Sequence, residues 1–124
     1  MRALKISLVL FVLLLALMIG GMIVIQKICN RMEVMLGTLP DLPTEEGWEQ
    51  AAELREYWHR RRGIVHPAVN HTELNAVTDM TDSLVIYADP DADEAVEYRR
   101  TRVLLYNAID ELRRLERFSF SNIV

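Results

Sequence analysis

The chain opens with one long apolar stretch, and the rest of its length has the spacing of amphipathic helices. From Ile6 to Ile25 there are 20 residues without a charge, and 14 of them are Leu, Ile, Val or Phe. A helix of this length rises about 30 Å, which matches the hydrocarbon thickness of a bilayer. The pattern therefore predicts a membrane span over about residues 6–25.

Two other interpretations of this stretch are weaker. The rest of the chain is too small to surround a uniformly apolar helix, which argues against a buried core helix. A cleaved signal peptide has a shorter apolar region that ends at two small residues. Ala16-Leu17-Met18 and Ile19-Gly20-Gly21 each lack one of these small residues. We expect residues 1–26 to be an uncleaved signal-anchor.

The charges that flank the span give a weak topology signal. Arg2 and Lys5 precede the span, while Lys27 and Arg31 follow it closely. A short basic N-terminus favours a cytoplasmic N-terminus, which predicts a single-pass protein of the cell membrane with residues 27–124 outside the cytoplasm. These residues hold 12 Lys and Arg against 18 Asp and Glu. Such an acidic balance argues against a nucleic-acid partner.

Apolar positions recur at intervals of three and four through residues 27–124, which predicts helices and no strand. Gly37, Pro40 and Pro43 interrupt the pattern after the first helix. Three more helices are expected: about 44–62 with Thr44 as its N-cap and Gly63 at its end, a third that begins between Pro67 and Thr72 and ends at Asp89-Pro90, and a fourth over about 91–116.

The expected core residues form one stripe on each helix. The stripes are Cys29, Met32, Met35, Leu36 and Leu39; Trp48, Ala51, Leu54 and Trp58; Leu74, Val77, Thr81, Leu84 and Ala88; and Ala95, Val96, Tyr98, Val103, Leu105, Tyr106, Ile109 and Leu112. The predicted fold class is all-α, a transmembrane helix that continues into a small antiparallel helical bundle. A faint repeat of 50–54 in 94–98 leaves two stacked helical hairpins as the alternative.

Arg99 and Arg102 fall within the apolar arc of the fourth helix. One interpretation pairs them with carboxylates of the third helix, Glu73, Asp79 and Asp82, since a buried cation needs a partner. The other is a small pocket between the helices for an anion or other ligand. The candidate pocket or interaction residues are Trp48, Trp58, His71, Glu73, Tyr98, Arg99, Arg102 and Tyr106.

The predicted helices also segregate charge along the domain. If each helix reverses direction, the second and fourth both end toward the membrane, and acidic residues lie at their far ends. Helix dipoles alone favour this arrangement, and contact with anionic headgroups is the functional alternative. The membrane-proximal basic residues are Arg60, Arg61, Arg62, Arg113, Arg114 and Arg117.

Other chemistry has little support in the sequence. The three histidines lack the spacing of a zinc site, and no serine lies on a glycine-flanked turn. We therefore expect no catalytic residue, no metal and no cofactor. Cys29 is expected at the membrane boundary, where acylation or an intermolecular disulfide is an alternative to a purely structural role. Ala16 and Gly20 form a small-xxx-small pair that could bring two spans together as a homodimer.

The motifs together resemble a small bacterial family catalogued as domain of unknown function 4363. The resemblance includes the basic N-terminus and single span, Trp48 with Leu54 and Trp58, His71-Thr72-Glu73-Leu74, and the tail 118–124. The last residue is Val124, where the family pattern has Leu. The resemblance implies a membrane protein of Gram-positive bacteria with no established activity, encoded beside a multi-span membrane protein.

These observations favour a non-enzymatic, membrane-tethered interaction or accessory domain that acts with another membrane or envelope protein. The alternative is a ligand-binding sensor module with a small pocket between helices. Residues 1–5 are too few to carry a cytoplasmic output, so such a sensor would also need a partner protein.

Overall fold

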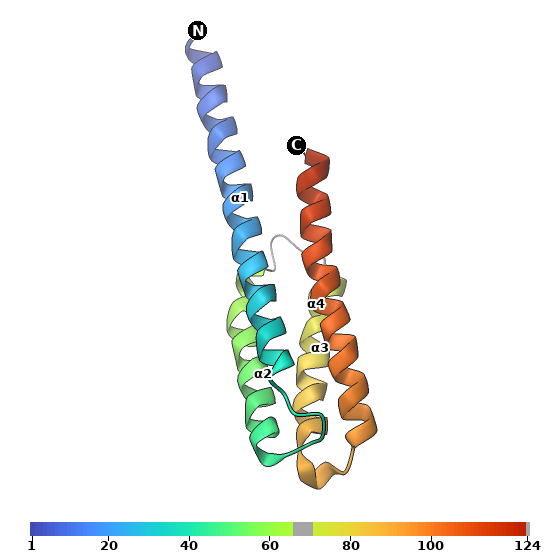
Figure 1. The fold of residues 1–124 in the computed structure, drawn as a ribbon. Coiled ribbons are helices and arrows are strands. Elements are labelled where there is room, and N and C mark those ends of the chain that lie inside the picture. Colours follow the sequence, from blue (N-terminus) through green and yellow to red (C-terminus); the bar gives the residue numbers. More distant parts are fainter. Residues whose placement is uncertain (66–70, 124) are drawn as a thin grey trace.

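The protein is all-helical, and its four α-helices pack side by side with alternating direction (Figure 1). The computed structural model describes residues 1–65 and 71–123, with residues 115–123 described by their backbone only. The elements are α1 (Arg2–Gly37), α2 (Glu45–Val65), α3 (His71–Ala88), the short 3-10 helix η2 (Pro90–Ala92) and α4 (Ala95–Ile123).

The helices close into a bundle rather than two stacked hairpins. α3 lies between α2 and α4, and α1 contacts both α2 and α4, so each helix packs against two neighbours in a ring. This ring settles the choice between the two predicted arrangements in favour of the closed bundle. The ends of α2 and α4 both point toward the end of the bundle from which α1 emerges (Figure 1).

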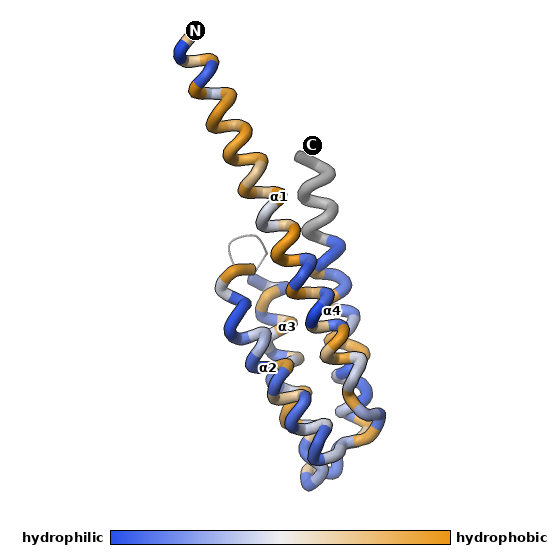
Figure 2. The backbone as a smooth tube through the Cα atoms, turned by 60° about the vertical axis from the view of Figure 1, so that its left-hand side comes forward, coloured by the Kyte–Doolittle hydropathy of each residue, from blue (hydrophilic) through white to orange (hydrophobic). Residues whose placement is uncertain are grey.

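α1 is one continuous helix of 36 residues that serves two environments. Its first two thirds project beyond the bundle, and after the first few residues Figure 2 shows an almost continuous run of apolar residues there. Only 6 % of its most apolar window is buried, so this segment is not a core helix of the bundle. By length and composition it is a helix that could cross a membrane. Ile25, the last residue of the expected span, already lies in the bundle core at 2 % exposure.

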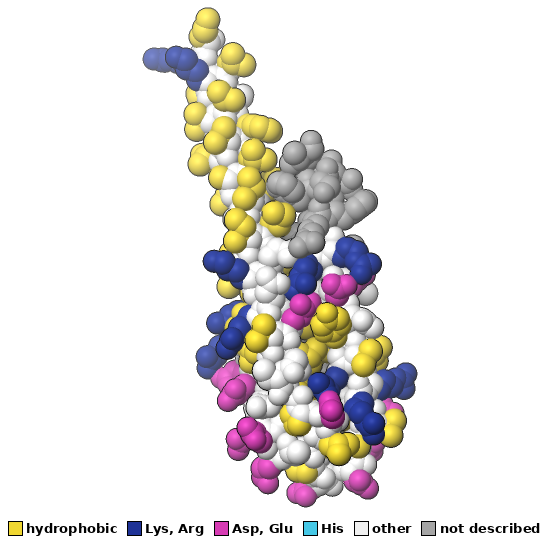
Figure 3. Space-filling model, viewed as in Figure 1, with side chains coloured by type: hydrophobic (Ala, Val, Ile, Leu, Met, Phe, Trp, Pro, Cys, Tyr) yellow, Lys and Arg dark blue, Asp and Glu magenta, His cyan; other side chains and the backbone are white. Residues whose placement is uncertain are grey.

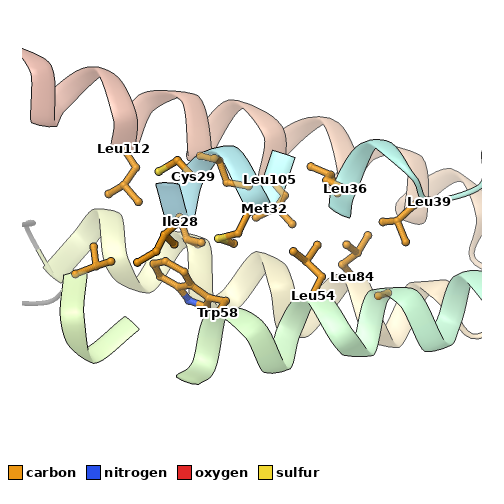
Figure 4. Close-up of a cluster of buried hydrophobic side chains, with 14 of the residues drawn as sticks. Ile28, Cys29, Met32, Leu36, Leu39, Leu54, Trp58, Leu84, Leu105 and Leu112 are labelled. Carbon is orange, nitrogen blue, oxygen red and sulfur yellow. The ribbon is translucent and has the colours of Figure 1, made fainter. Parts of the chain in front are cut away.

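The predicted stripes form most of the core. Figure 4 shows Ile28, Cys29 and Met32 of α1 gathered around Trp58, with Leu105 and Leu112 of α4 opposite. All five stripe residues of α3 are buried, as are Ala51, Leu54 and Trp58 of α2. Cys29 is fully buried, as its place in the predicted stripe of the first helix indicates. Its thiol is part of the packed core and is not accessible for acylation or an intermolecular disulfide.

Two helix boundaries differ from the predictions. α2 passes Gly63 and continues to Val65. The side chain of Val65 is buried, and this burial stabilises the extra half turn of helix. α4 begins at Ala95 rather than near residue 91, because Asp89 caps the separate helix η2 by accepting a hydrogen bond from the Asp91 amide at 2.9 Å. Asp93 then adopts a left-handed conformation with φ 53°, which separates the two helices.

The loop before α2 follows its predicted capping. Thr44 Oγ1 accepts a hydrogen bond from the amide of Gly47 at 3.0 Å, as an N-cap residue does. Pro67 and Asn70, which were expected at the start of the third helix, lie outside the described residues.

Candidate functional site

An open groove of about 530 Å³ lies between α1 and α4. This volume lies within the range of ligand pockets, although the groove is open along its length. We call it the α1/α4 groove. Its lining residues are Glu33, Leu36, Gly37, Asp41, Arg99, Arg102, Val103 and Tyr106.

Arg102 links α4 to the loop between α1 and α2 at one end of the groove. Its Nη1 donates a hydrogen bond to the Pro40 carbonyl oxygen at 3.1 Å and lies 3.5 Å from Asp41 Oδ1. The hydroxyl of Tyr98 donates to the same carbonyl at 2.7 Å, and the Arg102 guanidinium lies 5.6 Å from the Tyr98 ring centroid. Burial raises the pKa of Tyr98, and this outweighs the opposite effect of Arg102. These contacts fasten α4 to the loop that joins α1 and α2.

A second ion pair closes the end of the groove nearer the apolar segment of α1. Arg113 Nη2 lies 2.9 Å from Glu33 Oε2, and both side chains are largely buried. The pair has ion-pair distance but does not meet the criteria for a hydrogen bond. Glu33 Oε1, Arg113 Nε and Arg113 Nη2 have no hydrogen-bond partner in the described part of the chain. These atoms are buried, so the Glu33–Arg113 pair closes this end of the groove without presenting an exposed acceptor.

Between these two ion pairs, α4 presents an apolar strip to solvent. Val103 is 60 % exposed and Tyr106 is 50 % exposed, although both belong to the predicted core arc. Val96 is exposed as well, so the expected arc was too broad by one face. Arg99 lies one turn from Val103 and is also exposed. The groove thus has exposed apolar side chains beside charged ones.

The structure gathers only part of the predicted pocket set. Arg99, Arg102 and Tyr106 line the groove, and Tyr98 packs beside Arg102. Trp58 is fully buried in the core, and Trp48 lies on α2, 37 % exposed. His71 lines a different pocket with Arg62, and Glu73 follows in the first turn of α3.

The predicted pairing of Asp82 with an arginine of α4 was wrong. Asp82 Oδ1 accepts a hydrogen bond from Arg55 Nε at 2.8 Å and lies 2.8 Å from His59 Nε2, so both partners belong to α2. Partial burial would raise the pKa of Asp82, but the hydrogen bonds and charges of His59 and Arg55 outweigh it and lower that pKa. The sequence did contain a signal for this cluster, because Arg55 and His59 are four residues apart on one face of the predicted helix.

The predicted basic residues belong to the ends of α2 and α4, which point toward the end of the bundle from which α1 emerges (Figure 1), and Figure 3 shows Lys and Arg side chains at this level. Several of them are already engaged within the bundle. Arg60 pairs with Glu56, the Arg61 guanidinium stacks 3.8 Å from the Tyr57 ring centroid, and Arg114 pairs with Asp110 at 2.9 Å. Arg62 is exposed, and the side chain of Arg117 lies outside the described residues.

No group of three or more His, Cys, Asp or Glu side chains is placed to hold a metal ion within the described residues. No protein-family model matches the chain, and neither a curated protein nor a solved structure matches it significantly. The resemblance to the family named above therefore stays a prediction, and the functional argument depends on the geometry of the bundle.

Proposed function

We propose that this chain is a membrane-tethered, non-enzymatic interaction domain that binds another membrane or envelope protein outside the cytoplasm. The observation that carries the proposal is the continuity of α1. One helix, about 54 Å long at 1.5 Å per residue, joins an exposed apolar segment to the core of the bundle. The bundle is therefore held at a fixed distance and angle from the membrane rather than on a flexible tether.

We propose the α1/α4 groove as the surface that the partner contacts. The groove lies beside α1, the helix that would enter the bilayer, so a neighbouring membrane protein that emerges next to α1 can reach it. Val103 and Tyr106 supply exposed apolar area, while the exposed Arg99 can fix the register of a partner helix. Aromatic and arginine side chains of this kind are enriched at binding hot spots.

Affinity purification of the full-length protein from native membranes tests this surface. The variant Val103→Ser with Tyr106→Ser removes the apolar strip of the groove, so it should lose a partner that the wild type retains. The matched control is Ile86→Ser with Val96→Ser, since both residues are similarly exposed and lie outside the groove. A partner retained equally by both variants, or by neither, would contradict the assignment of the groove.

A small-ligand sensor is the second candidate, and the two arginines of the groove favour it. Arg99 and Arg102 next to Tyr106 could bind a small anion, although Arg102 already contacts Pro40 and Asp41. Mass spectrometry of small molecules released from the purified full-length protein distinguishes the candidates. A sensor should release a stoichiometric compound that is absent from an Arg99→Gln preparation.

A further inference from the structure

The bundle has no linker between its core and the apolar segment of α1. Ile25 and Ile28 are buried in the core, and Lys27 lies between them on the exposed side of the same helix. A membrane boundary at the end of the apolar segment would therefore lie directly against the bundle. The end of the bundle from which α1 emerges would touch the lipid surface. We therefore expect residues that suit contact with lipid at this end.

The last turns of α4 run beside the apolar segment. Gln26 Nε2 of α1 donates a hydrogen bond to the Arg113 carbonyl oxygen of α4 at 3.4 Å, which fixes the level at which the two helices meet. α4 continues from there to Ile123, which adds about 15 Å toward the N-terminus of α1. Figure 1 shows this end of α4 alongside α1, beyond the ends of α2 and α3.

The exposure of α1 agrees with this arrangement. Leu15, Met18 and Met22 are partly covered, whereas most of the other residues of the projecting segment are exposed. These three positions are spaced by three and four residues, so they share one face of the helix. The part of the apolar segment nearest the bundle is therefore partly covered on one face.

Exposed cations surround the point where α1 leaves the bundle. Lys27, Arg31 and Arg62 are exposed, and within the described chain none of them has an ion-pair partner. We call these three residues the basic collar. Figure 3 shows Lys and Arg side chains at this level and mainly Asp and Glu at the opposite end of the bundle. α3 contributes Glu73 and no cation to this end, so the collar lies on the α1 and α2 side.

Helix dipoles explain only part of the collar. Arg62 lies in the last turn of α2, where a cation is favoured. Lys27 and Arg31 lie inside α1, whose last turn has no basic residue, so the dipole does not account for them. They also oppose the usual charge bias if this side faces outward. Contact with anionic headgroups would offset that bias and explain their exposure.

We propose that the bundle sits directly on the outer leaflet, with the basic collar on anionic phospholipid headgroups and the last turns of α4 within the leaflet beside α1. The partner is thus an anionic lipid surface. The inference rests on the proposed membrane anchoring and is independent of the groove. Each cation near an anionic surface strengthens association by up to about fivefold, and salt should weaken this effect because it screens exposed charges.

Spin-label spectroscopy of the full-length protein in bilayers tests the collar. The measured quantity is the preference of the protein's lipid shell for spin-labelled phosphatidylglycerol over spin-labelled phosphatidylcholine. We expect at least about a threefold preference at low salt, which falls toward unity in high salt. The variant Lys27→Gln, Arg31→Gln, Arg62→Gln should also remove it. The control Arg55→Gln, Arg99→Gln, Arg100→Gln has the same change in net charge and should keep the preference.

A nitroxide on α4 tests the position of its last turns. A label at Ser119→Cys should be accessible to oxygen and protected from a water-soluble nickel reagent, and a label at Asn107→Cys should behave in the opposite way. Cys29 is fully buried and should stay unlabelled in the folded protein. Failure of the protein to float with the vesicles would contradict the anchoring itself. No lipid preference in floated protein, equal loss in the control variant, or a nickel-accessible label at position 119 would overturn the lipid contact alone.

Discussion

The indole Nε1 of Trp58 on α2 donates a hydrogen bond of 2.9 Å to Oγ1 of Thr78 on α3. The same hydroxyl donates to the Leu74 carbonyl oxygen one turn earlier, also at 2.9 Å. Trp58 is completely buried, so its one polar group has found a partner inside the core. The pair links α2 to α3 at a fixed register and makes Trp58 a structural residue rather than a binding residue.

Trp58→Ala should destabilise the bundle by about 3–5 kcal/mol, because it leaves a large cavity. Thr78→Val should cost about 1–3 kcal/mol, since it keeps the volume and leaves the indole N–H without a partner. Thermal unfolding of the full-length protein in detergent measures both changes. Trp48→Ala is the control, and its effect should be much smaller because Trp48 is partly exposed. Equal effects of the two tryptophan substitutions would show that Trp58 is not the core residue.

The two glycines of α2 should respond in opposite ways to alanine. A Cβ at Gly47 would lie 2.6 Å from Cγ of Pro40, whereas a Cβ at Gly63 would meet nothing within 4 Å. Gly63→Ala should stabilise the protein by up to about 1 kcal/mol, because alanine is the better helix former. Gly47→Ala should instead destabilise it by about 1–3 kcal/mol through overpacking, since Pro40 also accepts the hydrogen bonds of Tyr98 and Arg102.

Differential scanning calorimetry of these two variants provides the measurement. One kcal/mol corresponds to about 4–8 °C in Tm for a domain of this size. A rise in Tm for Gly47→Ala that equals the rise for Gly63→Ala would show that the loop around Pro40 does not press against α2.

The Asp82 cluster should make a small, pH-dependent contribution to stability. The pKa of Asp82 is lowered in the folded protein from its ordinary value of 3.8, so the carboxylate stabilises the fold fully above that value. The stabilisation is lost as the pH falls through the lower, folded pKa. Asp82→Asn should cost no more than about 1 kcal/mol at neutral pH, because the pair is partly exposed.

Unfolding curves measured from pH 7 down to strongly acidic pH test this dependence. The difference in free energy of unfolding between the wild type and Asp82→Asn should shrink as the pH falls below the ordinary pKa of Asp82. Asp79→Asn on the same helix is the control and should have little effect at any pH, because Asp79 is exposed. A difference for Asp82→Asn that is constant over the whole range would show that its charge does not stabilise the fold.

The sequence predicted the cores of α1 and α3 well because one narrow apolar stripe determines which face of each helix is buried. α4 was harder, since Val96, Val103 and Tyr106 extend its apolar arc onto a face that no other described helix covers. Helical periodicity shows which face of a helix carries apolar side chains. It does not show whether another helix packs against that face.

The partners of the charged residues could not be predicted for a related reason. α3 packs against both α2 and α4, so a carboxylate on it has two possible sources of cations. Asp82 turns to Arg55 and His59, while Arg102 reaches a backbone carbonyl in the loop at Pro40. Backbone acceptors in a loop have no sequence signature, because every residue carries one.

The proposed topology places residues 27–124 outside the cytoplasm. A reporter enzyme that works only outside the cytoplasm should be active when it is fused after Val124 in a bacterial host. A reporter that works only in the cytoplasm should be inactive at the same position. The reversed pattern would place the bundle in the cytoplasm and remove the proposed partner and lipid contacts from the outer surface.

The most direct test of the central proposal is the intact mass of the full-length protein recovered from membranes after washing with alkaline carbonate. The continuous helix α1 predicts that the protein stays in the membrane pellet and that its mass includes residues 1–26. Release into the supernatant, or a mass that places the mature N-terminus near residue 22, would contradict a permanent anchor and leave the bundle as a separate domain.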